Sequence, residues 1–147
     1  MAVHEMALTY FIAIIDLYSR FIVSWNLAKN MDALFCLEAL REAFKIAIPK
    51  IVNSDQGSQF TSDEWINFIE AQGATVSMCG KGRCFDNIFA ERLWRSLKYE
   101  EFYLKSYDSY NELYNSLDGY VYFYNHIRPH SSLQYRVPND VYNTKKS

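Results

Sequence analysis

Runs of β-forming residues alternate with helical patterns along this 147-residue chain, and no other feature restricts its fold as strongly. Residues 8–28 contain two apolar runs on either side of a polar turn at residues 16–20, which predicts an antiparallel hairpin. The segments that follow give the order helix, strand, helix, strand, helix, helix. This alternation predicts a single α/β domain in which helices pack on a sheet.

Capping residues set the expected ends of the helices. The first helix should begin after Asn30 or Asp32, because both side chains can accept a hydrogen bond from the first turn. Thr61 with Glu64 three residues later is typical of a capping box that opens a helix, and Gly73 should close that helix. A long last helix is predicted over residues 106–126, followed by a loosely held tail from about residue 137.

Composition predicts a folded, intracellular protein. Half of the residues are hydrophobic and 22% are charged, and no apolar run approaches the ~18 residues of a membrane span. The first residues do not resemble a signal peptide, so we expect a cytoplasmic location and no membrane partner. The net charge of −2 argues against non-specific coating of nucleic acid, although residues 79–147 carry ten Lys and Arg against eight Asp and Glu.

Two cysteines and two histidines raise the question of a zinc site. Cys79 and Cys84 are separated from His126 and His130 by 41 residues, whereas a zinc finger leaves ~12–15 residues between its two pairs. Free, reduced cysteines are therefore the favoured interpretation.

Two carboxylates are predicted near the ends of strands, where open α/β sheets bind their ligands. Asp55 follows a short predicted strand, and Glu91 lies early in the helix after the next strand. Glu91 shares one helix face with Arg95 and Lys98, so a metal-binding carboxylate would lie beside phosphate-binding cations. The alternatives are an ordinary turn residue at Asp55 and a surface ion pair between Glu91 and Arg95.

Three stretches together resemble one protein family. "NSDQGSQFTS", "GKGRCFDNIFAERLWRSLKYE" and "FYNHIRPHSSL" closely resemble the integrase-type transposases of bacterial insertion sequences, which are related to retroviral integrases and use an Asp, Asp, Glu triad. The family's second aspartate falls on Asp55 and its glutamate on Glu91. The 35 residues between them are the separation that the family shows.

The resemblance implies a fold, a cofactor and a substrate. The expected fold is an RNase-H-like integrase core with a mixed sheet flanked by helices, with its core over about residues 1–103 and a C-terminal helix and tail over about 104–147. Mg²⁺ or Mn²⁺, as two ions, is the implied cofactor. Transposon-end and target DNA are the implied partners, along with a homo-oligomer or the full-length transposase.

The same resemblance directs attention to possible DNA contacts. Lys81, Arg83, Arg95 and Lys98 are candidates for contacts with the DNA backbone, with solvated loop charges as the alternative for the first two. Arg128 is a candidate for contact with DNA or a partner. Candidates for hydrogen bonds near the active site are Gln56, Ser58 and Gln59.

One part of the family pattern does not occur in the 147 residues. The family's first aspartate lies in a Trp-x-x-Asp-Ile-Thr-Tyr stretch on the first strand, ahead of the segment that Met1 begins, and Asp16 matches a different family position. We therefore expect a sheet that lacks the first central strand, an unpaired edge along residues 9–15, and poor activity of the chain alone. The alternative function is a fragment that binds transposon DNA or the full transposase without catalysis. An RNase-H-like nuclease is disfavoured by "YNHIRPHSSL".

Overall fold

The computed structural model describes residues 2–6, 9–30, 32–54, 60, 62–78 and 86–146. The chain divides into two compact units. Unit 1 comprises Met1–Ile14 and Val23–Ala90, and unit 2 comprises Ile15–Ile22 and Glu91–Ser147. No helix in these described ranges is long and apolar enough to cross a membrane.

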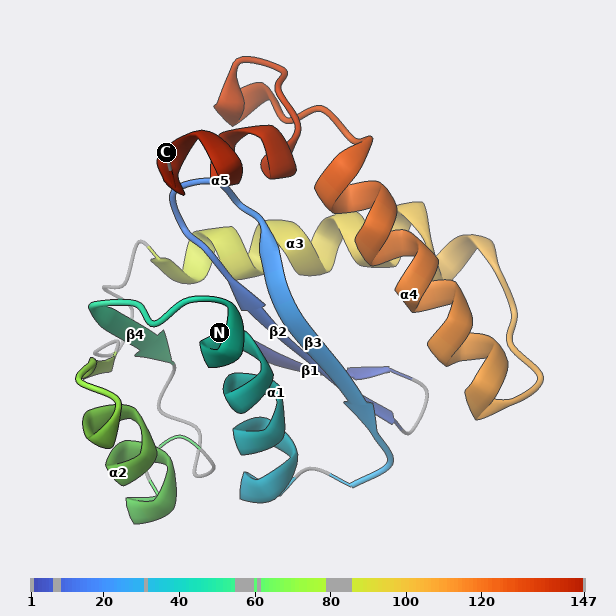
Figure 1. Ribbon diagram of the computed structural model, residues 1–147. Helices are drawn as coiled ribbons and strands as arrows, with labels where there is room; N and C mark the ends of the chain where they lie inside the picture. Colours follow the sequence, from blue (N-terminus) through green and yellow to red (C-terminus); the bar gives the residue numbers. More distant parts are fainter. Residues whose placement is uncertain are drawn as a thin grey trace. The chain divides into compact units, whose positions relative to one another are not determined.

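The described strands form two small sheets. β1 (Ala2–Met6), β2 (Thr9–Ile15) and β3 (Ile22–Ala28) make a three-stranded sheet with β2 in the middle (Figure 1). β4 (Ile51–Ser54) and β5 (Thr75–Met78) form a parallel pair. Antiparallel pairing thus occurs in the three-stranded sheet and parallel pairing in the separate β4–β5 sheet.

β1 corrects one expectation about the sheet. The sequence analysis predicted an unpaired edge along β2, but β1 runs antiparallel to it, from Ala2 opposite Ala13 to Met6 opposite Thr9. The prediction was wrong because it treated the first residues as unable to supply a strand. An exposed strand edge presents unsatisfied backbone groups, and the adjacent extended segment satisfies them.

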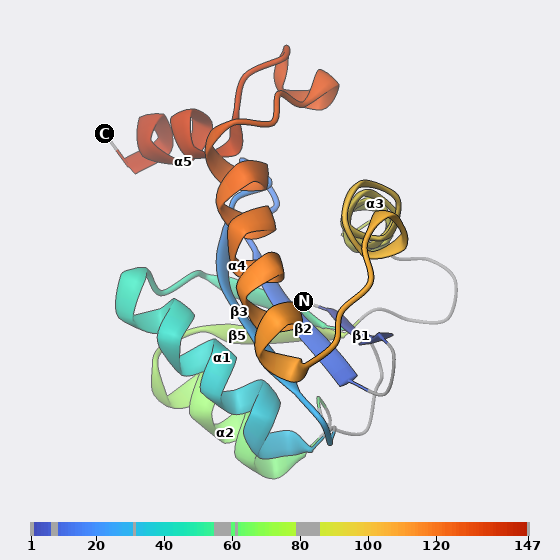
Figure 2. The ribbon, with the colours of Figure 1, turned by 90° about the vertical axis from the view of Figure 1, so that its right-hand side faces the viewer.

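Two helices and a hydrophobic core complete unit 1. α1 (Ala33–Ile46) and α2 (Asp63–Ala71) lie side by side in both views (Figures 1 and 2). The hydroxyl of Ser24 on β3 donates a hydrogen bond of 2.8 Å to the carbonyl of Ala39 on α1. Removing the apolar faces of these elements from water is the main stabilising contribution. The core includes the side chains of Ile12, Phe35, Leu40, Phe60, Trp65 and Ile69.

The helix ends follow the expected chemistry with one shift. Asp32 caps α1 by accepting a 2.7 Å bond from the Phe35 N–H, as predicted. α2 is capped by Ser62, which accepts from the Trp65 N–H, so the expected start at Thr61 was one residue early. Gly73, with φ of 87°, ends α2 in the left-handed conformation that glycine favours.

Unit 2 is built mainly from helices. It contains most of α3 (Asp86–Glu100), α4 (Tyr110–His126) and α5 (Pro138–Lys146), with short 3-10 turns at Phe102–Leu104 and Ser131–Leu133. α4 begins at Tyr110, because Ser109 caps it and accepts from the Glu112 N–H; the predicted start at residue 106 was too early.

The C-terminal segment also differs from expectation. Residues 138–146 form α5, which contacts α4, and Val141 and Tyr142 of α5 are buried. The ring of Tyr142 stacks on Phe21 with centroids 4.5 Å apart. The prediction of a loosely held tail was therefore wrong, because apolar burial fixes this segment.

Candidate functional site

α3 presents Glu91 to solvent. Leu93 and Leu97 of the same helix are buried, and Glu91 and Arg95 are exposed, so the predicted separation of apolar and charged faces is confirmed for these positions. Within the described ranges, no hydrogen bond or ion pair occupies the Glu91 carboxylate. A solvent-facing carboxylate of this kind is available as a ligand for a hard cation.

Arg95 contacts Tyr99, whereas the alternative interpretation required an ion pair with Glu91. Its guanidinium lies over the ring of Tyr99, 5.5 Å from the centroid. Among the described ion pairs none joins Arg95 to Glu91. The arginine is therefore held by an aromatic face and keeps its charge for a ligand. Lys98, one turn further along α3, is half-buried.

Several predicted site residues lie outside the described residues. This group includes the second carboxylate, which directly follows β4, and the residues of two loops. The predictions made for them therefore remain predictions. They are Asp55, Gln56, Ser58, Gln59, Lys81 and Arg83 for the active site and DNA, and Cys79 and Cys84 for the zinc alternative.

The donor set suits a hard divalent cation. Asp55 and Glu91 offer only carboxylate oxygens, which Mg²⁺ and Mn²⁺ prefer, whereas zinc sites are richer in Cys and His. In the part of the chain that the structure describes, no three His, Cys, Asp or Glu side chains gather as a metal site. His126 stacks on the ring of Tyr122 with centroids 4.4 Å apart.

An open hollow of about 540 Å³ lies on unit 2. One wall comes from α3 and the other from the segment after α4. Three arginines and one glutamate line it, so the hollow is electropositive. Its lining residues are Arg92, Arg95, Ser96, Tyr99, Glu100, Arg128, Ser131 and Ser132.

Arg128 and Glu100 join the two walls. The Nε atom of Arg128 lies 2.8 Å from Oε1 of Glu100, and its Nη2 atom lies 2.7 Å from Oε2, which is a bidentate pair. Burial alone would raise the pKa of Glu100, but the hydrogen bonds and charge of Arg128 lower it overall. Arg128 was predicted to contact DNA or a partner; the structure shows its guanidinium bound to Glu100.

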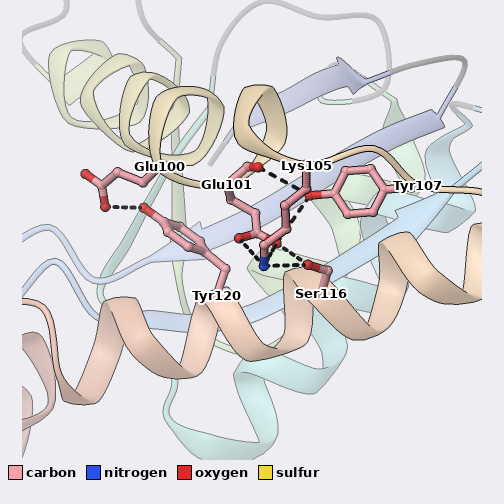
Figure 3. A network of polar contacts seen from close by, with 6 residues as sticks. All are labelled: Glu100, Glu101, Lys105, Tyr107, Ser116 and Tyr120. Atoms are coloured by element: carbon pink, nitrogen blue, oxygen red, sulfur yellow. Dashed lines mark hydrogen bonds and ion pairs between the residues drawn. The ribbon is translucent and has the colours of Figure 1, made fainter.

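A second carboxylate on the same turn fixes the end of α3. Glu101 is only 5% exposed and accepts hydrogen bonds from Ser116, from Tyr107 at 3.2 Å and from Lys105 at 3.1 Å (Figure 3). Glu100 beside it accepts a bond of 3.1 Å from Tyr120 (Figure 3). Adjacent carboxylates thus attach α3 and the loop after it to α4.

Asn125 and His130 in the "FYNHIRPH" stretch are buried, and the sequence analysis did not predict their contacts. The Asn125 side chain is buried, accepts from the Ile22 N–H at 2.8 Å and donates to the Ile22 carbonyl at 3.0 Å. His130 is also buried, and its ring meets that of Tyr124 edge to face, with centroids 4.6 Å apart. Burial, followed by the nearby charge of Arg128, lowers the pKa of His130.

Comparison with known families decides the class of the chain. A family model described as integrase core domain matches residues 3–84, which is more than half of the chain. The chain belongs to the integrase core domain family. A second model with the same description matches residues 72–138 of this integrase core.

Curated relatives of this integrase core are named as transposases. It is 32% identical over 137 residues to the transposase for insertion sequence element IS904 of Lactococcus lactis subsp. lactis, covering 90% of this chain and 54% of the relative. It is 30% identical over 137 residues to the putative transposase InsK for insertion sequence element IS150 of Escherichia coli, covering 91% and 48%. The chain thus spans about half the length of these relatives.

Solved structures show the same fold. The catalytic core domain of BIV integrase matches with a TM-score of 0.81 at 17% identity, covering 99% of this chain and 93% of that one. A chain of a simian T-cell lymphotropic virus intasome matches with a TM-score of 0.70 at 16% identity, covering 88% and 47%. The RNase-H-like fold class expected from the sequence is therefore confirmed.

Proposed function

We propose that this integrase core is the catalytic region of an insertion-sequence transposase that cleaves phosphodiester bonds at transposon ends and transfers the strands to target DNA. One observation carries the proposal: the family matches span both Asp55 and Glu91, separated by 35 residues. The exposed, unengaged carboxylate of Glu91 on α3 supports it.

Asp55 and Glu91 would hold the Mg²⁺ or Mn²⁺ ions. When bound, a pair of such ions supplies activation of a water or 3′-hydroxyl nucleophile and stabilisation of the leaving oxygen. Glu91 supplies an oxygen ligand from the solvent-facing side of α3, and α3 is anchored by the burial of Leu93 and Leu97. A ligand carried by a packed helix is positioned more precisely than one carried by a loop.

The proposed DNA contacts extend from these carboxylates. Arg95 and Lys98 follow Glu91 by one and two turns on α3. Gln56, Ser58, Gln59, Lys81 and Arg83 would add hydrogen bonds and charge from their loops. The proposed partners are transposon-end and target DNA and further copies of the transposase.

Metal binding tests the proposal without requiring catalysis. We expect the 147-residue chain to bind Mn²⁺, measured by electron paramagnetic resonance of the free ion. Asp55→Asn and Glu91→Gln should each weaken binding at least tenfold, because each removes an anionic oxygen ligand. Glu70→Gln, a change at an exposed position of α2, is the matched control. Equal Mn²⁺ binding by all four proteins would refute the assignment of these carboxylates.

A second candidate function applies to the 147 residues acting by themselves. Such a chain would bind transposon DNA or the full-length transposase and regulate it. Incubation with Mg²⁺, transposon-end DNA and a target plasmid should then yield no joined product; a joined product would exclude this candidate.

A further inference from the structure

An exposed pair of tyrosines lies where α3 passes into the following 3-10 turn. Tyr99 is 62% exposed and Tyr103 is 60% exposed, and their rings meet in a T-shaped contact with centroids 5.5 Å apart. Leu104, next in the chain, is 73% exposed. All three residues belong to unit 2. Single exposed apolar residues need no explanation, whereas an exposed aromatic pair with an apolar neighbour is a candidate interaction surface.

Neighbouring side chains hold both rings in place. The guanidinium of Arg95 lies over the ring of Tyr99. Tyr103 contacts Phe102 with centroids 5.9 Å apart, and Phe102 stacks on Tyr107 at 6.0 Å. The hydroxyl of Tyr107 is in turn hydrogen-bonded to the buried carboxylate at the end of α3 (Figure 3). Rings that are already ordered lose little conformational entropy when a ligand stacks on them.

The chemistry of this surface selects a flat, anionic ligand. The open faces of tyrosine rings stack on nucleobases of any sequence, because every base has a π-face. The positive charge of Arg95 lies at the border of the pair and, among the described ion pairs, no carboxylate neutralises it. A nucleic-acid strand matches this combination better than an uncharged apolar peptide does. Paired bases inside a duplex are covered by their neighbours, so the ligand must offer unpaired bases.

The tyrosine pair lies at a defined distance from the proposed metal ligand. Tyr99 follows Glu91 by eight residues of α3, which is ~12 Å of helix rise. Successive nucleotides of one strand in duplex DNA are ~3.4 Å apart along the axis. A base at Tyr99 would therefore lie a few nucleotides away from a phosphate held at Glu91.

We propose that Tyr99 and Tyr103 form a stacking site for unpaired bases of the DNA strand, a few nucleotides from the reacting phosphate. Leu104 adds apolar contact at its border. Arg95 is a positioning residue for the first ring and Phe102 for the second. The inference rests on the proposed function and deepens it, because it specifies that the bound DNA presents unpaired bases.

Fluorescence of a base analogue in DNA tests the stacking site on the full 147-residue chain. The probe is a 12-nucleotide single-stranded DNA that contains 2-aminopurine, whose fluorescence should fall on binding because stacking quenches it. Tyr99→Leu and Tyr103→Leu keep an apolar side chain but remove the aromatic face. Each should weaken binding roughly tenfold and reduce the quenching, the size expected for one lost base stack. The slope of log K against log salt should not change, because no phosphate contact is lost.

Conservative and matched variants make the outcome specific. Tyr99→Phe keeps the aromatic face and should bind like the unaltered chain. Tyr122→Leu changes a tyrosine of α4 that is also 60% exposed and should have no effect on the probe. A blunt duplex of the same sequence should bind Tyr99→Leu and the unaltered chain equally. Circular dichroism confirms folding of each variant.

Three results would overturn the stacking site. They are no quenching by the unaltered chain, equal losses in Tyr99→Leu and Tyr122→Leu, and self-association of the chain in sedimentation that Tyr99→Leu abolishes, which would make this surface a protein interface. The proposed function is decided separately, since Glu91→Gln should lose Mn²⁺ and retain the quenching. Tyr99→Leu should do the reverse.

Discussion

The guanidinium of Arg128 and the carboxylate of Glu100 form a bidentate ion pair between residues 28 positions apart in the chain, with N to O distances of 2.7 and 2.8 Å. The pair connects the last turn of α3 with the segment after α4. Both side chains are partly exposed, at 26% for Arg128 and 34% for Glu100, so solvent screens part of their attraction.

Glu100→Gln should lower the free energy of unfolding at pH 7 by about 1 kcal/mol, the size expected for a partly exposed charged pair with good geometry. Because the folded-state pKa of Glu100 is lowered from 4.5, the contribution is present above that value and is lost as pH falls below it. Urea unfolding at pH 7 and pH 3 should therefore show a smaller difference between the two proteins at pH 3. Glu42→Gln, which breaks the exposed pair with Lys45, should cost no more than ~0.5 kcal/mol.

Protonation of His130 should destabilise the fold. Its folded-state pKa is lowered from 6.5 by burial and by the charge of Arg128, so it stays neutral while the unfolded chain takes up a proton. Stability should be complete above pH 6.5 and fall as pH decreases below it, with a slope of at most about 1.4 kcal/mol per pH unit from this group. His130→Gln should remove this slope in urea unfolding between pH 7.5 and 5, and His126→Gln should retain it; an unchanged slope in His130→Gln would contradict the prediction.

Asn125→Ala should destabilise the chain strongly. The side chain is 4% exposed and satisfies both the N–H and the carbonyl of Ile22, and its removal leaves two buried backbone groups without partners. We expect a loss of ~2–4 kcal/mol in the free energy of unfolding, since each unsatisfied group costs about 1–3 kcal/mol. Asn143→Ala is the control: Asn143 is exposed and, among the described residues, its side chain bonds that of Asn139, so its loss should stay within ~0.5 kcal/mol.

Glu101→Ala should also be destabilising, by ~2–3 kcal/mol, because it removes the shared acceptor of Ser116, Tyr107 and Lys105. Glu101→Gln keeps an acceptor oxygen and should lose less than half as much. Thermal unfolding followed by circular dichroism measures both. Equal losses would show that packing volume, and not hydrogen bonding, accounts for the effect of Glu101.

Short-range patterns in the sequence predicted much of the fold. The order of strands and helices from β2 to α4, the Asp32 cap, the Gly73 terminus and the apolar stripe with Leu93 and Leu97 all follow from neighbours within about four residues. The α4 start was misplaced because the side chain that caps this helix is Ser109, which accepts from the Glu112 N–H. The stretches "NSDQGSQFTS", "GKGRCFDNIFAERLWRSLKYE" and "FYNHIRPHSSL" resembled the family, which the comparison then showed.

The sequence by itself thus determined the class of fold, the family and the candidate carboxylates. Only the tertiary structure decided that β1 pairs with the edge of β2. The same holds for the hydrogen bonds of Asn125 to Ile22, 103 positions away in the sequence, and for the ion pair of Arg128 with Glu100. These contacts depend on how distant segments meet, and no local pattern encodes the identity of a partner so far along the chain. The hollow with Arg95 and Ser131 exists for the same reason: packing of the polypeptide assembles its two walls from separate segments.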